Sequence, residues 1–326
     1  MGQKDKCGVA LQTALGTKAT TMDYWPPVTE ATLEPDRQTL EMDEALGLYE
    51  KAAPDMGSKT YGGTIAGAVR PTSIGCLLSA AFGAPTTSTV TTGVYSHVWD
   101  VAAGNPLPFS TMCVNGDPTT AIVDLFYDAY INALELSAQS NDYMMFSADV
   151  VALHLDDSQS NPSSTLDGSS RFTWAQLAAQ IAVSGGSLGD IDVSNWRFRR
   201  NTNIEVDDVA FGDTEANGVT RGVATMEGSF TATGKDNVST HYRRALLDSP
   251  ADVRLVLTAT GGTISGAHKY TLTVDIKKLR YTKASKPVSG SDPLKNTTVD
   301  FGAYLDGSQS VVITLKNADA GTNYAP

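Results

Sequence analysis

Two six-residue stretches organise this sequence: Thr64–Val69 (TIAGAV) and Thr225–Phe230 (TMEGSF), which align without a gap. Both alternate apolar residues with small or polar ones, which is the pattern of a half-buried β-strand. A second pair of segments, Ile131–Leu136 (INALEL) and Ile276–Tyr281 (IKKLRY), aligns in the same way. Because the matched segments follow the same order in both halves, the sequence predicts an internal duplication.

A predicted helix follows each of the first matched strands. In the first half, Pro71 opens a run that ends at Gly83, with proline in the first turn and glycine at the expected end of the helix. In the second half, a similar run ends at Leu247 and is stopped by Pro250. The remaining pattern is that of short strands, apart from a short helix expected over residues 172–183. The sequence therefore predicts an all-β protein with a flanking helix in each of two tandem β-sandwich or barrel domains.

Composition suggests where these domains begin and end. The 326 residues suffice for two domains of ordinary size. Residues 156–170 are rich in Asp, Ser, Asn, Pro and Gly, as in a linker or a long surface loop. Trp25-Pro26-Pro27 favours an extended arm of the kind that ties subunits together. We expect an N-terminal arm at residues 1–32, a first β domain at 33–158, a linker at 159–190 and a second β domain at 191–326.

Charge is unevenly distributed along the chain. Residues 1–160 carry 7 Lys or Arg against 19 Asp or Glu, whereas residues 161–326 carry 17 of each, and the formal net charge is −12. Such a chain is poorly suited to grip a phosphate backbone, because that binding needs Lys and Arg to release counterions. The acidic half could instead form a surface past which nucleic acid slides, or simply keep the protein soluble.

Motifs for chemistry are few. The three cysteines and four histidines have neither zinc-site nor redox-pair spacing, and the thiols are expected to be free in a reducing cytoplasm. Asp124 and Asp128, in a strand, would lie about 13 Å apart, too far for a catalytic acid–base pair. Gly261–Gly266 lacks the lysine and the helix of a phosphate-binding loop, and Asp156–Asp167 lacks EF-hand spacing. We expect no catalytic, cofactor-binding or metal-binding residues, no cofactor and no enzymatic activity.

One basic cluster is interleaved with aromatic residues: Trp196, Arg197, Phe198, Arg199 and Arg200. At strand spacing, Trp196, Phe198 and Arg200 share one face, and Arg197 and Arg199 share the other. Aromatic residues beside arginines can bind single-stranded nucleic acid. Because the first half is acidic, we favour a protein partner for these arginines instead.

Several segments resemble the tail tube proteins, also called major tail proteins, of long-tailed bacteriophages. They are the strand and helix from Gly63 to Gly83, the segment Phe126–Leu136 (FYDAYINALEL), and the ending Thr297–Asn317, in which an Asp-Gly turn precedes VVITLKN. The resemblance extends from about residue 33 to residue 318. It implies two tandem tail-tube-type domains whose inner sheets join those of neighbours into a ring. Stacked rings would form the hollow tube that conducts DNA from the capsid to the host.

The resemblance also implies partners and a location. The main partner would be the chain itself, as a ring of three two-domain chains forming a pseudo-hexamer, or of six chains. Other partners would be the tape measure, tail terminator and distal tail proteins, with double-stranded DNA passing through the lumen without specific binding and no membrane. The protein would be assembled in the host cytoplasm and reside in the virion. We expect acidic residues of the first half to face the lumen, and the arm at residues 1–30 and the acidic loop near 41–55 to contact the adjacent ring.

The alternative is a two-domain β-sandwich binding module, such as a capsid decoration or carbohydrate-binding protein. Trp99 and Trp174 could be its exposed aromatic platforms, although tryptophan in strand and helix patterns is more often buried. The stretch from Cys7 to Gly16 is weakly apolar and interrupted by polar residues, so it predicts neither a secretory signal nor a membrane span.

Overall fold

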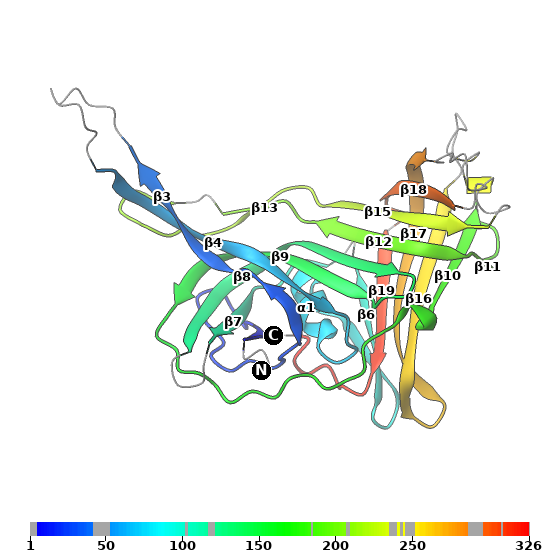
Figure 1. Cartoon of the computed structure of the whole chain (residues 1–326), viewed down its shortest axis with the longest axis horizontal. Coiled ribbons are helices and arrows are strands. Elements are labelled where there is room, and N and C mark those ends of the chain that lie inside the picture. Colours follow the sequence, from blue (N-terminus) through cyan, green and yellow to red (C-terminus); the bar gives the residue numbers. More distant parts are fainter. Residues whose placement is uncertain are drawn as a thin grey trace.

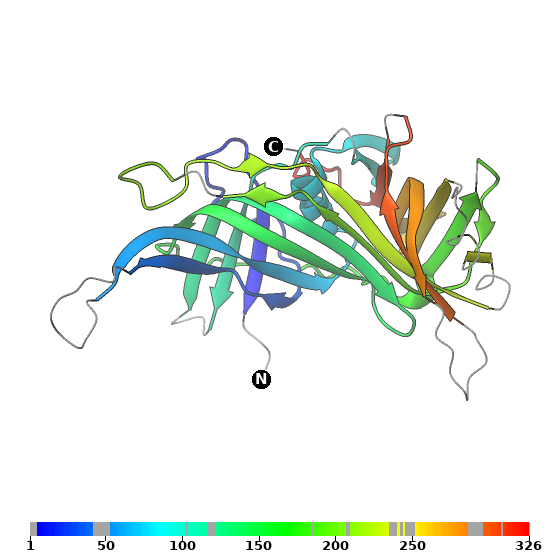
Figure 2. The ribbon, with the colours of Figure 1, turned by 90° about the horizontal axis from the view of Figure 1, so that it is seen from above.

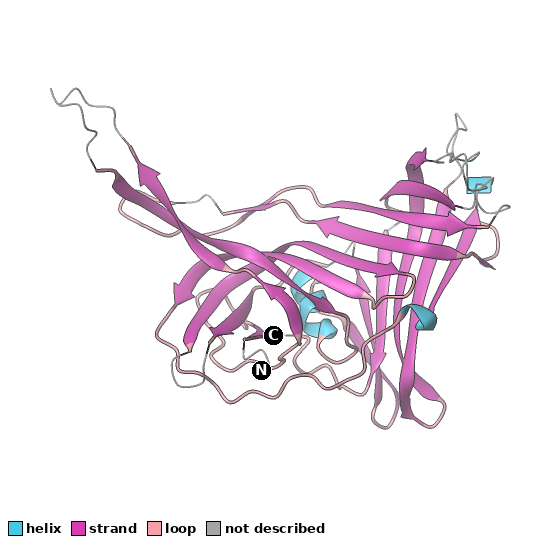
Figure 3. Ribbon diagram, viewed as in Figure 1, coloured by secondary structure: helices cyan, strands magenta, loops and turns pink. Residues whose placement is uncertain are grey.

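The computed structural model shows an antiparallel β-protein, which confirms the all-β prediction (Figures 1 and 3). It describes residues 5–41, 53–101, 104–116, 121–183, 185–206, 209–234, 240–241, 244, 252–285, 296–307 and 309–325.

The described residues of the first half form nine strands and a helix between β4 and β5. They are β1 (Lys6–Leu11), β2 (Val28–Ala31), β3 (Glu34–Leu40), β4 (Asp55–Ala68), α1 (Ile74–Phe82), β5 (Thr86–Thr91), β6 (Val94–Asp100), β7 (Phe109–Asn115), β8 (Ile122–Gln139) and β9 (Met145–Asp156). The second half contains a short 3₁₀ helix, η1 (Trp174–Gln176), followed by β10 (Leu177–Val183), β11 (Gly189–Asp190), β12 (Val193–Asn201), β13 (Ile204–Glu205), β14 (Thr220–Arg221), β15 (Thr225–Thr233), β16 (Val253–Ser265), β17 (His268–Ser285), β18 (Asn296–Ala303) and β19 (Val311–Asn317).

The two halves pair their strands in the same order. In the first half the antiparallel order is β4–β9–β8–β7–β1. In the second half it is β15–β18–β17–β16–β10. The two ladders differ in how one side of their longest strand is paired. In the first half β9 runs along most of β8, whereas in the second half β18 and β19 share the same side of β17. The helix α1 follows β4, and the helical residues Thr240, His241 and Arg244 follow β15.

The aligned sequence segments occupy matching positions in these ladders. One row of facing residues crosses three strands in each half: Glu135, Ser147 and Ala66 in the first, and Arg280, Gly302 and Glu227 in the second. In the sequence alignment Ala66 matches Glu227 and Glu135 matches Arg280. The two independent sequence matches therefore fall in one and the same row.

Two glycines, Gly67 and Gly228, repeat the same close packing. A Cβ atom at either position would collide with a backbone carbonyl oxygen of the adjacent chain segment and would crowd a phenylalanine ring. The crowding groups are the Pro27 carbonyl and the Phe146 ring at Gly67, and the Arg197 carbonyl and the Phe301 ring at Gly228. Only glycine fits either position without displacing the neighbouring strand.

Strand β12 joins the two halves into one sheet. It pairs with β15 on one side and with the C-terminal part of β8 on the other. A continuous antiparallel ladder therefore runs through β2 and β3, β4, β9, β8, β12, β15, β18 and β17, and we call it the long ladder (Figure 2). Within the described residues, β2 and β3 pair only with β4, and β17 beyond Leu279 pairs only with β18.

The larger of the two hydrophobic clusters among the described residues lies beneath the long ladder. All nine residues of α1 are buried, and they pack with apolar side chains from both halves, such as Ile65 of β4 and Phe198 of β12. The chain's last segment closes this core, because Tyr324 is fully buried and its hydroxyl donates to the Thr72 carbonyl (2.7 Å). Its ring lies against Gly75 of α1, where a Cβ atom would collide with it.

Three local expectations are corrected. Residues 6–11 are not an arm: β1 is almost wholly buried and pairs along its length with β7. The helix predicted over residues 172–183 is wrong, because only Trp174–Gln176 forms a 3₁₀ turn and Leu177–Val183 pairs with β16. The Thr-rich sequence of residues 86–93 predicts a turn, but Thr86–Thr91 forms β5. Most of the second predicted helix lies outside the described residues.

Candidate assembly surface

The long ladder has one core face and one polar face. Along β12, Trp196, Phe198 and Arg200 are buried, whereas Arg197 and Arg199 lie on the opposite side, as the sequence alternation predicted. Because facing residues of a ladder share a side, the register of the neighbouring strands extends this polar face. Its members include Thr64, Glu135, Ser137, Ser147, Asp149, Arg197, Arg199, Glu227, Ser229, Thr231, Thr298 and Asp300.

The arginines of the polar face bind carboxylates of the first half. Arg197 contacts Glu135 (2.7 Å), and this hydrogen bond raises the pKa of Arg197. Arg199 contacts Asp149 (2.8 Å) and lies 3.9 Å from Glu135. These ion pairs cross from β12 to β8 and β9, so the partner of the basic cluster lies within the chain, at the junction of its two halves.

Backbone and side-chain hydrogen bonds extend this junction beyond β12. The Thr202 amide donates to the carbonyl of Asn132 (2.7 Å), and the Ile204 amide donates to the Asn132 side-chain oxygen (2.8 Å). Beneath the charged row, Phe198 of β12 faces Leu136 of β8, and both are buried. The junction therefore combines a polar row above with an apolar row below.

The loop between β13 and β14 is fastened to the first half by Glu215. Its carboxylate accepts hydrogen bonds from the Tyr61 hydroxyl and from His154 Nδ1 (2.9 Å). Burial raises the pKa of Glu215, but the bonds from Tyr61 and His154 outweigh it and leave the pKa below its ordinary value. Nearby, the Lys59 amide donates to the Thr214 carbonyl (2.7 Å). No sequence pattern pointed to this contact, because Glu215 is far from Tyr61 and His154 in the sequence.

The equivalent hairpin of the first half, β2 to β4, is far less covered. All seven residues of β3 are exposed, as are Thr29, Glu30 and Ala31 of β2. Leu40 and Met56, near the end of this hairpin, are exposed by 52% and 59%. In Figures 1 and 2 this hairpin projects away from the body of the molecule at the left. The acidic loop expected at 41–55 lies mainly outside the described residues.

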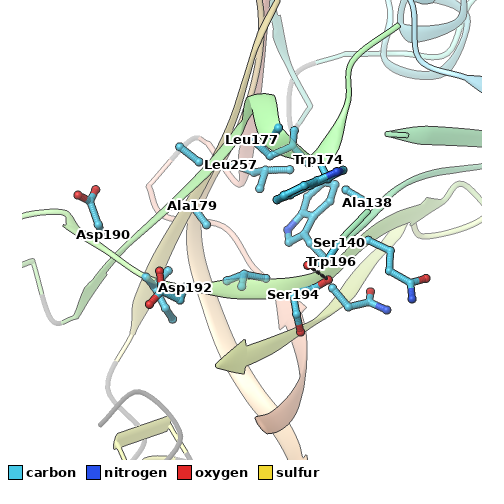
Figure 4. A pocket seen from close by; sticks show the side chains of 16 residues that line it. Ala138, Ser140, Trp174, Leu177, Ala179, Asp190, Asp192, Ser194, Trp196 and Leu257 are labelled. Atoms are coloured by element: carbon cyan, nitrogen blue, oxygen red, sulfur yellow. Dashed lines mark hydrogen bonds between the residues drawn. The ribbon is translucent and has the colours of Figure 1, made fainter. Parts of the chain in front are cut away.

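A hollow of about 420 Å³ lies where η1 and β10 pass β12 (Figure 4). Trp174 stands at this hollow with 48% of its surface exposed, and the buried Trp196 lies beside it. The Ser140 amide donates to the Ser194 carbonyl (2.9 Å) across the same region. The other tryptophan considered as a platform, Trp99, is buried and donates to Ser79 Oγ (3.2 Å).

The histidine and cysteine side chains described below are held in the interior of the fold. His97 is buried, which lowers its pKa, and its ring nitrogens contact Thr87 (2.9 Å) and Asn317 (3.1 Å). Cys7 and Cys113 face each other on β1 and β7 as free thiols, with their sulfur atoms 3.6 Å apart. Their separation in sequence gave no sign of this. Among the residues that the structure describes, no three His, Cys, Asp or Glu side chains gather as a metal site would require.

Comparison with known proteins gives a family match for nearly the whole chain. The model of a family described as phage tail tube protein matches residues 2–303. A search of curated proteins finds no match. In the described parts of the chain, no helix is both long and apolar enough to cross a membrane.

Proposed function

Because the chain belongs to the phage tail tube protein family, we propose that its copies join side by side into rings, and that the rings stack into the hollow tube through which double-stranded DNA passes from capsid to host. The chain is thus a structural protein of the phage tail. The observation that carries the proposed assembly is the long ladder, whose two outer edges each have a strand partner on one side only among the described residues.

An open edge strand is a ready template for pairing with another chain. In the long ladder the two open edges belong to different strands, so copies can join head to tail. Head-to-tail contacts form a closed ring when the rotation between copies closes, and a closed ring leaves no edge unpaired. The exposed backbone of β2 and β3 is therefore accounted for by a neighbouring copy.

The matching ladders support a two-domain chain and a ring of three chains. The predicted domains, 33–158 and 191–326, contain the corresponding ladders, and the strands β1 and β10, in the segments predicted as arm and linker, complete them at equivalent positions. We place the boundary in residues 157–172, which contain no strand or helix. Three such chains would give six similar domains around the ring. A ring of six chains is the alternative.

The polar face of the long ladder is the surface we assign to the lumen. The two arginines that β12 contributes to it are held by Glu135 and Asp149, so they are poorly placed to bind phosphates. Glu227 and Asp300 add carboxylates to the same face. DNA would then pass a polar wall without adhering, because the described residues of this face include no cluster of unpaired cations to replace its counterions. An assembled tube with a basic inner wall would contradict this assignment.

Family membership also supports the remaining proposed partners and location. These are the tape measure, tail terminator and distal tail proteins, in a virion assembled in the host cytoplasm. The acidic loop near 41–55, at the end of the projecting hairpin, is our candidate for contact with the adjacent ring.

Negative-stain electron microscopy of the purified chain at rising concentration tests the proposal, with preformed tube ends added as an initiator in a parallel series. We expect hollow tubes whose end views show six lobes, and a ring mass equal to three chains by native mass spectrometry. Monomers at every concentration, with and without tube ends, would overturn the proposed assembly.

A further inference from the structure

We propose that neighbouring chains join by repeating the junction that already exists inside each chain: β2 of one chain pairs with β17 of the next, and Glu30 faces Arg280. This inference rests on the proposed ring and specifies the contact that closes it. The internal junction between β12 and β8 is its template.

Strands β2 and β12 occupy equivalent positions in the ladders of the two halves. Arg199 of β12 faces Glu227 of β15, and Glu30 of β2 faces Ala66 of β4. Ala66 and Glu227 are aligned in the sequence, and their neighbours Gly67 and Gly228 share the same close packing. Glu30 therefore occupies in the first half the position that Arg199 occupies in the second.

Strands β8 and β17 also occupy equivalent positions in these ladders. Glu135 and Arg280 are aligned in the sequence and occupy the same row of their ladders, each two strands away from the aligned pair Ala66 and Glu227. Arg280 therefore occupies in the second half the position of Glu135 in the first. Beyond Leu279, this side of β17 has no strand partner among the described residues.

Charge complementarity supports the pairing of β2 with β17 independently of strand register and sequence alignment. Inside the chain, Glu135 of β8 faces Arg199 of β12. At the equivalent contact between chains, Arg280 faces Glu30. Both signs are exchanged, and an acid still meets a base.

The two side chains are accessible for this contact. Glu30 is exposed, and the side chain of Arg280 is 52% exposed. Asp252 contacts Arg280 through Nε (3.0 Å), and a guanidinium group has further N–H donors for a second carboxylate. Arg199 shows the same behaviour inside the chain, where it lies near both Asp149 and Glu135.

The apolar row below the charges is also repeated. Phe198, which faces Leu136 at the internal junction, faces Gly228 on its other side. Val28 faces the equivalent Gly67, so Val28 takes the place of Phe198. Tyr281, aligned with Leu136, supplies the opposite side chain. The junction between chains would therefore have a charged row above an apolar row, as the internal one has.

A charge exchange tests the contact in the full-length chain. Glu30→Arg and Arg280→Glu should each raise the concentration needed for half-maximal assembly by about fivefold or more, because like charges then face each other. The double variant should return toward the wild-type value. Lys269→Glu, on β17 at the far end from the open edge, is the matched control and should assemble as the wild type does. Single variants that assemble normally, or a double variant as impaired as the singles, would overturn the contact.

Cross-linking gives a second readout that does not depend on assembly strength. Directly facing residues of neighbouring strands bring their Cβ atoms close to disulfide range, and the native cysteines are all buried. The Glu30→Cys, Arg280→Cys double variant should form disulfide-linked dimers and closed trimers on oxidation, whereas Glu30→Cys with Lys269→Cys should not. If the wild type forms rings but the double cysteine variant does not cross-link, the contact is disproved and the proposed function stands. If the wild type forms no rings, the proposed function is disproved.

Discussion

Strand β12 and strand β2 hold the same place in two similar ladders, yet their surroundings differ. β12 is paired on both sides, and its Trp196 and Phe198 are buried. Among the residues that the structure describes, β2 pairs with β4 alone, and its Thr29, Glu30 and Ala31 are exposed. One position thus serves the stability of the chain in the second half, and is available to a neighbouring chain in the first. Equivalent substitutions at the two edges should separate folding from assembly.

The largest difference is expected for the apolar pair Phe198 and Val28. Phe198→Ala should lower the free energy of unfolding by about 3–5 kcal/mol, because it leaves a cavity where the side chain is fully buried. Val28→Ala should cost about 1 kcal/mol or less in the isolated chain, because Val28 is only half-buried, but should weaken assembly. Urea unfolding below the assembly concentration measures both. Equal losses for the two variants would contradict the comparison.

A smaller difference is expected for the charged pair Arg199 and Arg280. Arg199→Glu places a carboxylate beside Glu135 and Asp149, and should lower the free energy of unfolding by about 1 kcal/mol. Arg280→Glu should change it by about 0.5 kcal/mol or less, since its ion pair with Asp252 is exposed. Thermal unfolding of dilute samples checks this order. A larger loss for Arg280→Glu would mean that the edge of β17 is already covered within the chain.

The Glu215 contact should make the stability of the loop between β13 and β14 sensitive to acid. Because the pKa of Glu215 is lowered in the folded chain, its contribution is complete above the ordinary value of 4.5 and is lost as the pH falls through the lower folded value. Because the Glu215 side chain is still about a third exposed, solvent screening keeps this contribution below about 1 kcal/mol. Glu215→Gln should abolish this part of the pH dependence, measured by unfolding between pH 3 and pH 6 (roughly the carboxylate range). An unchanged pH profile would exclude the carboxylate as the fastening group.

The smallest effect is expected at the hollow beside η1, away from both edges. Trp174→Ala should change the free energy of unfolding by about 0.5 kcal/mol, because the side chain is half-exposed, and should leave assembly unchanged. The assembly assay above measures this directly. A loss of assembly would extend the contact between chains to the hollow and weaken the contrast between β2 and β12.

Local pattern predicted the long strands well, because alternation and burial agree along them. β4, β8, β12 and β17 lie where alternating residues placed them, and α1 lies between the expected Pro71 and Gly83. Pattern was misleading where a distant partner decides the structure. Leu177, Ala178 and Ile181 have helical spacing, but pairing with β16 makes them a strand. Likewise, weak periodicity near residue 6 concealed a strand that β7 buries.

The candidate interface was only partly accessible from sequence. The duplication and the alternation of Arg197 with Phe198 could be recognised, because they depend on local order. The partner of Arg197 could not be recognised, because Glu135 comes within its reach only through strand pairing across more than sixty residues. The relation of Glu30 to Arg280 becomes visible only when strand register ties each residue to its counterpart in the other half.

The exchange of charge signs between the two junctions also distinguishes a pairing of unlike halves from a pairing of like halves. If a first half met another first half, Glu30 would face Glu135, and if two second halves met, Arg199 would face Arg280. Both mismatches set like charges opposite each other, which destabilises a strand pair. In the proposed ring, alternation of the two halves therefore sets opposite charges against each other in this row, both within a chain and between chains.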